Sequence, residues 1–117
     1  MKGFGNPYKE KKKKNQKTKS STEQIINQAF KFHSKGNISE AARYYQYLIN
    51  QGFNDYRVFS NYGLILQNIG KLQDAELSYR KAIEINPNYA NAYSNLGNVL
   101  KDLGKLQDAE LSYRKAI

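Results

Sequence analysis

The chain has 117 residues, enough for one domain, and 19 Lys and Arg against 10 Asp and Glu give it a formal charge of +9. With no Cys and one His, disulfides and the ordinary thiolate or polyhistidine metal sites are excluded. No apolar run approaches the roughly 18 residues of a membrane span, and the basic N-terminus lacks the apolar stretch of a secretion signal. We therefore expect a soluble, cytoplasmic protein without a membrane partner.

The positive charge is concentrated at the N-terminus. Residues 1–20 hold eight lysines and one acidic residue, Glu10, whereas residues 21–117 carry eleven basic and nine acidic side chains. Because so polar and self-repelling a segment cannot bury surface, residues 1–21 are predicted to be a disordered, Lys-rich tail. The tail could bind nucleic acid or anionic lipid as an electrostatic arm. A solubilising leader without a specific partner is the interpretation we favour.

From Thr22 onward the sequence repeats with a period of 34 residues. The fourteen residues GKLQDAELSYRKAI occur at 70–83 and again at 104–117. The units that start at Tyr56 and Ala90 are identical at eighteen of the twenty-eight positions they share, and a more divergent unit starts at Thr22. A fixed period of this length indicates a solenoid. The predicted organisation is a degenerate first repeat at 22–55, a second at 56–89 and a truncated third at 90–117.

Each unit is predicted to be a pair of amphipathic helices with a glycine between them. The expected helices span about 22–35 and 38–51, 56–69 and 72–85, and 90–103 followed by one from about 105 onward. Gly104 is expected to end its helix with a positive φ. Asn37 with Glu40 resembles a capping box, and Asn88 suits either a turn or a helix N-cap.

The apolar spacing also predicts which side of each helix is buried. In the third repeat the buried residues are expected to be Tyr93, Leu96, Gly97, Leu100, Leu103, Leu106, Ala109, Tyr113, Ala116 and Ile117. Gly63 and Gly97 lie inside helices, where glycine costs about 1 kcal/mol relative to alanine. They therefore predict a close approach of two helices, with the small residues Ala75 and Ala109 opposite them.

This pattern resembles the tetratricopeptide repeat family. Counted within each unit, the family has an aromatic fourth, a large apolar seventh and a small eighth residue. It then has bulky, small, aromatic and small residues at eleven, twenty, twenty-four and twenty-seven, and proline at thirty-two. The second repeat supplies Phe59, Tyr62, Gly63, Leu66, Ala75, Tyr79, Ala82 and Pro87. The first repeat departs from the pattern, as terminal repeats commonly do, at Ile25, Gln28, Leu48 and Phe53. The resemblance implies an all-α, right-handed superhelical solenoid of antiparallel helix pairs, whose first helices line a concave groove.

Asparagine occupies the sixth position of all three repeats, at Asn27, Asn61 and Asn95. The resemblance implies that this position points into the groove, where an asparagine ladder would hold an extended peptide. A carboxamide both donates and accepts, so it can pair with a peptide backbone whatever the peptide's sequence. The alternative is that Asn is simply abundant, since thirteen of 117 residues are Asn. The same register gives as further groove residues Ser60, Leu64, Asn91, Ser94, Asn98 and Lys101.

The sequence predicts a binding function without catalysis. It has no catalytic constellation and no cofactor or metal site, and His33 is expected to face solvent. The leading hypothesis is a protein-interaction scaffold that binds an extended peptide or partner segment on its concave face. The third repeat, AYSNLGNVLKDLGKLQDA, is also similar to the repeats that precede the catalytic domain of O-linked N-acetylglucosamine transferases. The alternative is therefore the substrate-recruiting region of such a transferase, with the catalytic domain downstream.

The last predicted helix stops at Ile117, the twenty-eighth position of its repeat, and its apolar side has no predicted cover. Repeat arrays need polar caps at their ends. We therefore expect further repeats in a longer protein, which is the interpretation we favour, or self-association through the uncapped repeat.

Overall fold

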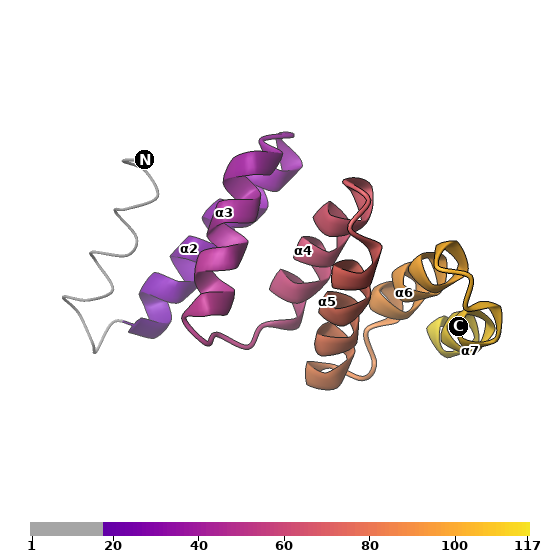
Figure 1. Ribbon diagram of the computed structural model, residues 1–117. Helices are drawn as coiled ribbons and strands as arrows, with labels where there is room; N and C mark the ends of the chain where they lie inside the picture. The colour runs from indigo at the N-terminus through magenta and orange to yellow at the C-terminus, as the bar shows by residue number, and fades with distance from the viewer. Residues whose placement is uncertain (1–17) are drawn as a thin grey trace. The chain divides into compact units, whose positions relative to one another are not determined.

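A computed structural model describes residues 18–117, where it contains six α-helices and no strand (Figure 1). The helices are α2 (Thr18–Ser34), α3 (Ile38–Asn50), α4 (Tyr56–Asn68), α5 (Leu72–Ile85), α6 (Ala90–Asp102) and α7 (Leu106–Ala116). The chain divides into two compact units between Phe53 and Asn54, so α2 and α3 belong to one unit and α4 to α7 to the other. The predicted all-α fold of helix pairs is confirmed.

The bounds of α3 to α7 agree with the predicted helices to within about one residue, but α2 begins at Thr18 instead of Thr22. Ser and Thr both suit the start of a helix, and they stand at 18, 20, 21 and 22, so the sequence did not single out one start. Residues 18–21 of the predicted disordered tail are therefore helical. The rest of that prediction, including the electrostatic arm, concerns residues 1–17 and lies outside the described residues.

A tight glycine turn ends the first helix of each pair. Gly104 has a φ of 84°, as predicted, and its N–H donates to the carbonyl of Lys101 at 3.0 Å. The next N–H, of Lys105, donates to the carbonyl of Leu100 at 2.8 Å. These two bonds make a Schellman motif, which needs a residue that adopts positive φ at little cost. The same pair of bonds recurs at Gly36, Gly70 and, at the end of α3, Gly52.

The predicted capping box at the start of α3 is wrong. Asn37 is the N-cap residue, but its side chain makes no cap hydrogen bond, so there is no reciprocal pair with Glu40. The glycine turn before α3 holds Asn37 at φ −81° and ψ 73°, outside the extended conformation that N-cap residues usually adopt. A true side-chain cap stands at Asp55, which is extended and whose Oδ1 accepts from the backbone N–H of Arg57 at 2.8 Å.

The connection between α5 and α6 is a turn through Pro87 and Asn88. Oδ1 of Asn86 accepts from the backbone N–H of Asn88 at 3.2 Å. Of the two predicted roles for Asn88, the turn is therefore right, and the N-cap of α6 is Tyr89. The ring of Tyr89 packs edge-on against Tyr56 with centroids 4.9 Å apart, which ties the starts of α6 and α4 together.

A tyrosine of the second helix packs against the glycine of the first helix in both repeats of the α4–α7 unit. A Cβ built on Gly63 would lie 3.0 Å from Cε1 of Tyr79, and one on Gly97 would lie 2.6 Å from Cε1 of Tyr113. The close approach is thus confirmed, but its predicted partners, Ala75 and Ala109, are wrong. A long helical side chain covers the turn N-terminal to its own Cα, so the ring reaches the place predicted for the alanine.

The core of the α4–α7 unit lies where α5 and α6 meet. Its buried members are Leu66, Ala75, Tyr79, Leu96, Val99, Leu100 and Ala109. The predicted buried stripe of α6 is confirmed at Leu96, Gly97 and Leu100. On α7, by contrast, Leu106 and Ile117 were predicted to be buried and are 64% and 105% exposed. Within residues 18–117 no helix packs against that side of α7.

Candidate functional site

The predicted groove residues of the α4–α7 unit lie on its two first helices. Asn61 and Leu64 are half-buried on α4. On α6, Asn91, Asn95 and Asn98 are spaced four and three residues apart, which places them on one helix face. Asn91, Asn98 and Lys101 are exposed, whereas Ser94 and Asn95 are half-buried. This arrangement gives α6 a row of carboxamides.

Asn61 and Asn95 have the property that a peptide-binding ladder needs. Both side chains are half-buried, and neither makes a hydrogen bond to any residue in the described part of the chain. A carboxamide offers two donors and one acceptor with two lone pairs. In a half-buried position that capacity is held near an apolar surface, where pairing with a peptide backbone replaces fewer bonds to water.

Two other predicted groove residues stand differently. Ser60 is 4% exposed, so its hydroxyl has little access to a ligand in this structure. Asn27 is exposed on α2 and belongs to the other unit. A single column through Asn27, Asn61 and Asn95 would span both units, and it stays a prediction.

A hydrogen bond that the sequence analysis missed recurs between the two helices of a repeat. The hydroxyl of Tyr79 donates to Oε1 of Gln67 at 2.8 Å, and the hydroxyl of Tyr45 is hydrogen-bonded to Nδ1 of His33 at 2.9 Å. Gln67 and His33 hold the twelfth position of their repeats, and the tyrosines hold the twenty-fourth. A polar residue at twelve that can accept a hydrogen bond was the available signal.

The third repeat makes this bond with a different partner. Lys101 holds its twelfth position, and an ammonium group cannot accept a hydrogen bond. The hydroxyl of Tyr113 donates instead to Oδ1 of Asn98. Asn98 therefore helps to hold α6 and α7 together, and its carbonyl oxygen is engaged within the repeat.

His33 was predicted to face solvent, and this is wrong. Its side chain is half-buried, and its ring packs edge-on against Tyr45 with centroids 5.7 Å apart. Burial lowers the pKa of His33 from its ordinary value of 6.5. The twelfth position lies against the tyrosine of the second helix, which is why the ring is covered.

Replacing His33 with Gln is expected to reduce the pH dependence of stability. Because the pKa of His33 is lower in the folded state, the unfolded state takes up its proton first, so stability is complete above about pH 6.5 and falls as the pH drops through that value. Gln keeps an acceptor for Tyr45, as Gln67 does for Tyr79. Thermal unfolding of both proteins between about pH 7.5 and 5.5 covers the range in which His titrates. Parallel pH profiles would contradict the assignment to His33.

A second surface feature was not predicted. A groove of about 550 Å³ lies between α5, α6 and α7, and none of the predicted site residues lines it. Its lining consists of Arg80, Ile83, Glu84, Tyr93, Leu96, Asp108, Leu111, Ser112 and Lys115. Leu111 is 52% exposed at its edge. The groove thus offers an apolar floor with two cationic and two anionic side chains.

Among residues 18–117, no helix is both long and apolar enough to cross a membrane. The same residues contain no group of three or more Asp, Glu or His side chains that could hold a metal ion.

Helix pairs that recur every 34 residues, each closed by a glycine turn, define a helical repeat protein. Residues 63–104 match a family model described as TPR repeat, and residues 23–55 match one described as tetratricopeptide repeat. Together these matches place the chain in the tetratricopeptide repeat family. No curated protein matches the chain.

Several solved structures share this fold. The second tetratricopeptide repeat domain of Spaghetti (RPAP3) is 22% identical, with a TM-score of 0.78 over 87% of this chain and 94% of that one. MamA is 21% identical, with a TM-score of 0.78 over 97% of this chain and 64% of that one. The translocator chaperone SycD of Yersinia enterocolitica is 24% identical, with a TM-score of 0.74 over 83% and 74%. At these identities the likeness establishes the fold alone.

Proposed function

We propose that this protein is an interaction module that binds an extended peptide without catalysis, on the face of α4 and α6 that carries Asn61 and Asn95. The observation that carries the proposal is the pair of half-buried carboxamides that have no hydrogen-bond partner within residues 18–117. They occupy the same position in two successive repeats. A ligand that paired with both would follow the repeat.

The spacing of such a site fits an extended chain. Packed helices lie about 8–10 Å apart, and three extended residues span about 10 Å. One asparagine can therefore pair with the backbone at every third residue of a peptide. Because the contact is to the peptide backbone, it tolerates many peptide sequences.

Structures of similar fold support a peptide ligand. The second tetratricopeptide repeat domain of Spaghetti was solved with the HSP90 peptide SRMEEVD, and SycD was solved with a peptide of the translocator YopD. PcrH, 23% identical with a TM-score of 0.77 over 84% of this chain and 74% of that one, was solved with the chaperone-binding region of PopD. For this protein we propose a peptide that need not be acidic, because the central positions of the face hold Asn61 and Asn95 in place of Lys or Arg.

The double substitution Asn61→Ala and Asn95→Ala tests the proposal. Peptides selected from a displayed library of unstructured sequences would be measured against both proteins by fluorescence anisotropy. Each lost hydrogen bond is worth about 1 kcal/mol, so the double variant should bind about tenfold or more weakly while its circular dichroism is unchanged. Asn50→Ala, at an exposed Asn on α3, is the matched control and should bind normally. Equal affinity for the double variant and the wild type would remove the ladder from the proposal.

The alternative of a substrate-recruiting region in a glycosyltransferase stays a prediction. No residue in the described part of the chain favours it over peptide binding. The reading frame beyond Ile117 tests it directly, since the alternative requires a catalytic domain there.

A further inference from the structure

The apolar side of α7 copies a surface that is covered elsewhere in the same chain. Residues 104–117 repeat residues 70–83 letter for letter, so the two second helices present the same side chains. On α5 this surface packs in the core against α6. The residues that meet are Leu72, Ala75, Tyr79 and Ile83 of α5 with Leu96, Val99, Leu100 and Leu103 of α6. The sequence of α6 is therefore already complementary to the surface that α7 displays.

On α7 the same positions are open. Leu106 and Ile117 are 64% and 105% exposed, and Tyr113 is half-buried where its copy, Tyr79, is fully buried. No helix in the described part of the chain covers them. We call this surface the α7 face and define it as Leu106, Ala109, Glu110, Tyr113 and Ile117.

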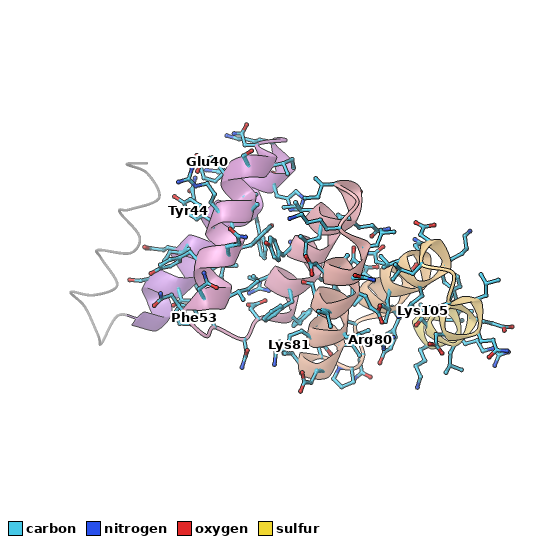
Figure 2. All side chains as sticks on the ribbon, in the orientation of Figure 1. Glu40, Tyr44, Phe53, Arg80, Lys81 and Lys105 are labelled. Carbon is cyan, nitrogen blue, oxygen red and sulfur yellow. The ribbon has the colours of Figure 1, made fainter. Side chains whose placement is uncertain are left out.

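The covered copy also shows an ionic contact. Glu76 on α5 accepts from Nε of Arg80 at 3.0 Å and from Nζ of Lys105 at 3.2 Å (Figure 2 labels both cations). Lys105 directly follows Gly104, the glycine that ends α6. Burial acts to raise the pKa of Glu76, but the hydrogen bonds from Arg80 and Lys105 hold it below its ordinary value. The lysine that follows α6 thus belongs to the way α6 docks on α5.

Glu110 is the copy of Glu76 on the α7 face. Its carboxylate accepts from Arg114 at 3.2 Å, the same bond that Arg80 makes in the covered copy. Among residues 18–117 no lysine takes the place of Lys105 beside it. The side chain of Glu110 is accordingly 68% exposed, against 14% for Glu76.

We propose that the α7 face is a docking site for an amphipathic helix of the α6 type, presented by a separate polypeptide. The helix would carry apolar residues at the spacing of Leu96, Val99, Leu100 and Leu103. It would end in Gly-Lys, and that lysine would pair with Glu110. This site lies on another helix from the proposed peptide face and goes beyond it.

A separate polypeptide fits better than a second copy of this chain. The chain holds two helices of the required pattern, α4 and α6, each followed by Gly-Lys. Their apolar side chains are already buried: Ile65 and Leu66 are 5% and 7% exposed, and Val99 and Leu100 are fully buried. Either helix would have to leave its own core in order to dock on another molecule.

A peptide of residues 87–105 with blocked ends, added to the ¹⁵N-labelled full chain, tests the proposal by NMR. We expect saturable shifts at Leu106, Ala109, Tyr113 and Ile117. Because a free helix of this length is only marginally stable in water, we expect a Kd of about 10–500 μM. Leu106→Asp should abolish the shifts, since it places a charge in the apolar contact.

A charge exchange tests the ionic contact separately from folding. Glu110→Lys should weaken binding of the peptide about fivefold, as a partly exposed ion pair turned into a repulsion allows. The peptide with Lys105→Glu should recover that loss on the Glu110→Lys protein only. Asp102→Lys, which changes the charge equally, is the control. Its copy Asn68 stays exposed although α6 is in place, so position 102 lies outside the contact.

Three outcomes overturn the proposal. The first is no binding at 1 mM peptide, about twice the weakest Kd expected. The second is a set of shifts that leaves α7 unchanged, or binding that is indifferent to the charge of Glu110. The third is concentration-dependent self-association of the wild type in sedimentation experiments that Leu106→Asp removes, which would assign the face to a second copy.

Discussion

Tyr79→Ala is expected to lower the free energy of unfolding of the α4–α7 unit by about 3–5 kcal/mol, the usual loss for a large buried aromatic side chain. The ring is fully buried, lies against Gly63 and belongs to the core that α5 shares with α6. Its hydroxyl also donates to Gln67, and burial raises the pKa of that hydroxyl, so it stays protonated and able to donate. Urea unfolding followed by circular dichroism measures the loss.

Tyr113→Ala is the matched control, because Tyr113 has the same neighbours in sequence over fourteen residues. Its ring also lies against a glycine, Gly97, and its hydroxyl also has a partner, but it is half-buried on α7. We expect a loss of about 1–2 kcal/mol, since the cost of truncation follows the contacts that are removed. Equal losses for the two variants would show that cover by the following repeat contributes nothing at this position.

The fold could be predicted because its signals are local in the sequence. The 34-residue period, the apolar stripe of α6 and glycines such as Gly104 each act within one helix or one turn. A positive φ at the end of a helix demands glycine whatever lies further away, so that prediction needed no tertiary information.

The missed features depend on geometry between elements. The partner of Gly63 is the ring of Tyr79 because of the direction in which a helical side chain leans, which residue spacing does not state. His33 is covered by the second helix of its own repeat, and Asn37 fails to cap because the preceding turn fixes its backbone. Leu106 matches Leu72 in sequence, yet its exposure is decided by the helix that packs next to it.

The candidate site could be predicted in part for the same reason. Register along one helix correctly placed Asn91 and Asn95 on a common face of α6. Register alone did not show that Asn98 is engaged by Tyr113 or that Ser60 is nearly inaccessible, because neighbouring helices decide both.

Gly63→Ala is expected to destabilise the α4–α7 unit by about 1–2 kcal/mol, although alanine is the better helix former by about 1 kcal/mol. The added methyl group would lie 3.0, 3.1 and 3.2 Å from three ring carbons of Tyr79. This ring is fully buried and cannot turn away without disturbing α6, so overpacking at about 1–3 kcal/mol outweighs the gain in helix propensity. Ala29 holds the equivalent position opposite Tyr45 in the first repeat, so the expected cost comes from shifting two helices apart.

A double-mutant cycle separates the two effects. In a Tyr79→Leu background the shorter side chain no longer meets the methyl group, so Gly63→Ala should become stabilising through helix propensity alone. Gly97→Ala meets the ring of Tyr113 at 2.6 Å, but that ring is half-buried at the end of the unit and can move, so its cost should be smaller. If Gly63→Ala were stabilising in the wild-type background as well, the glycine would not be explained by the tyrosine. The contact between α4 and α5 would then have room for a methyl group at its closest point.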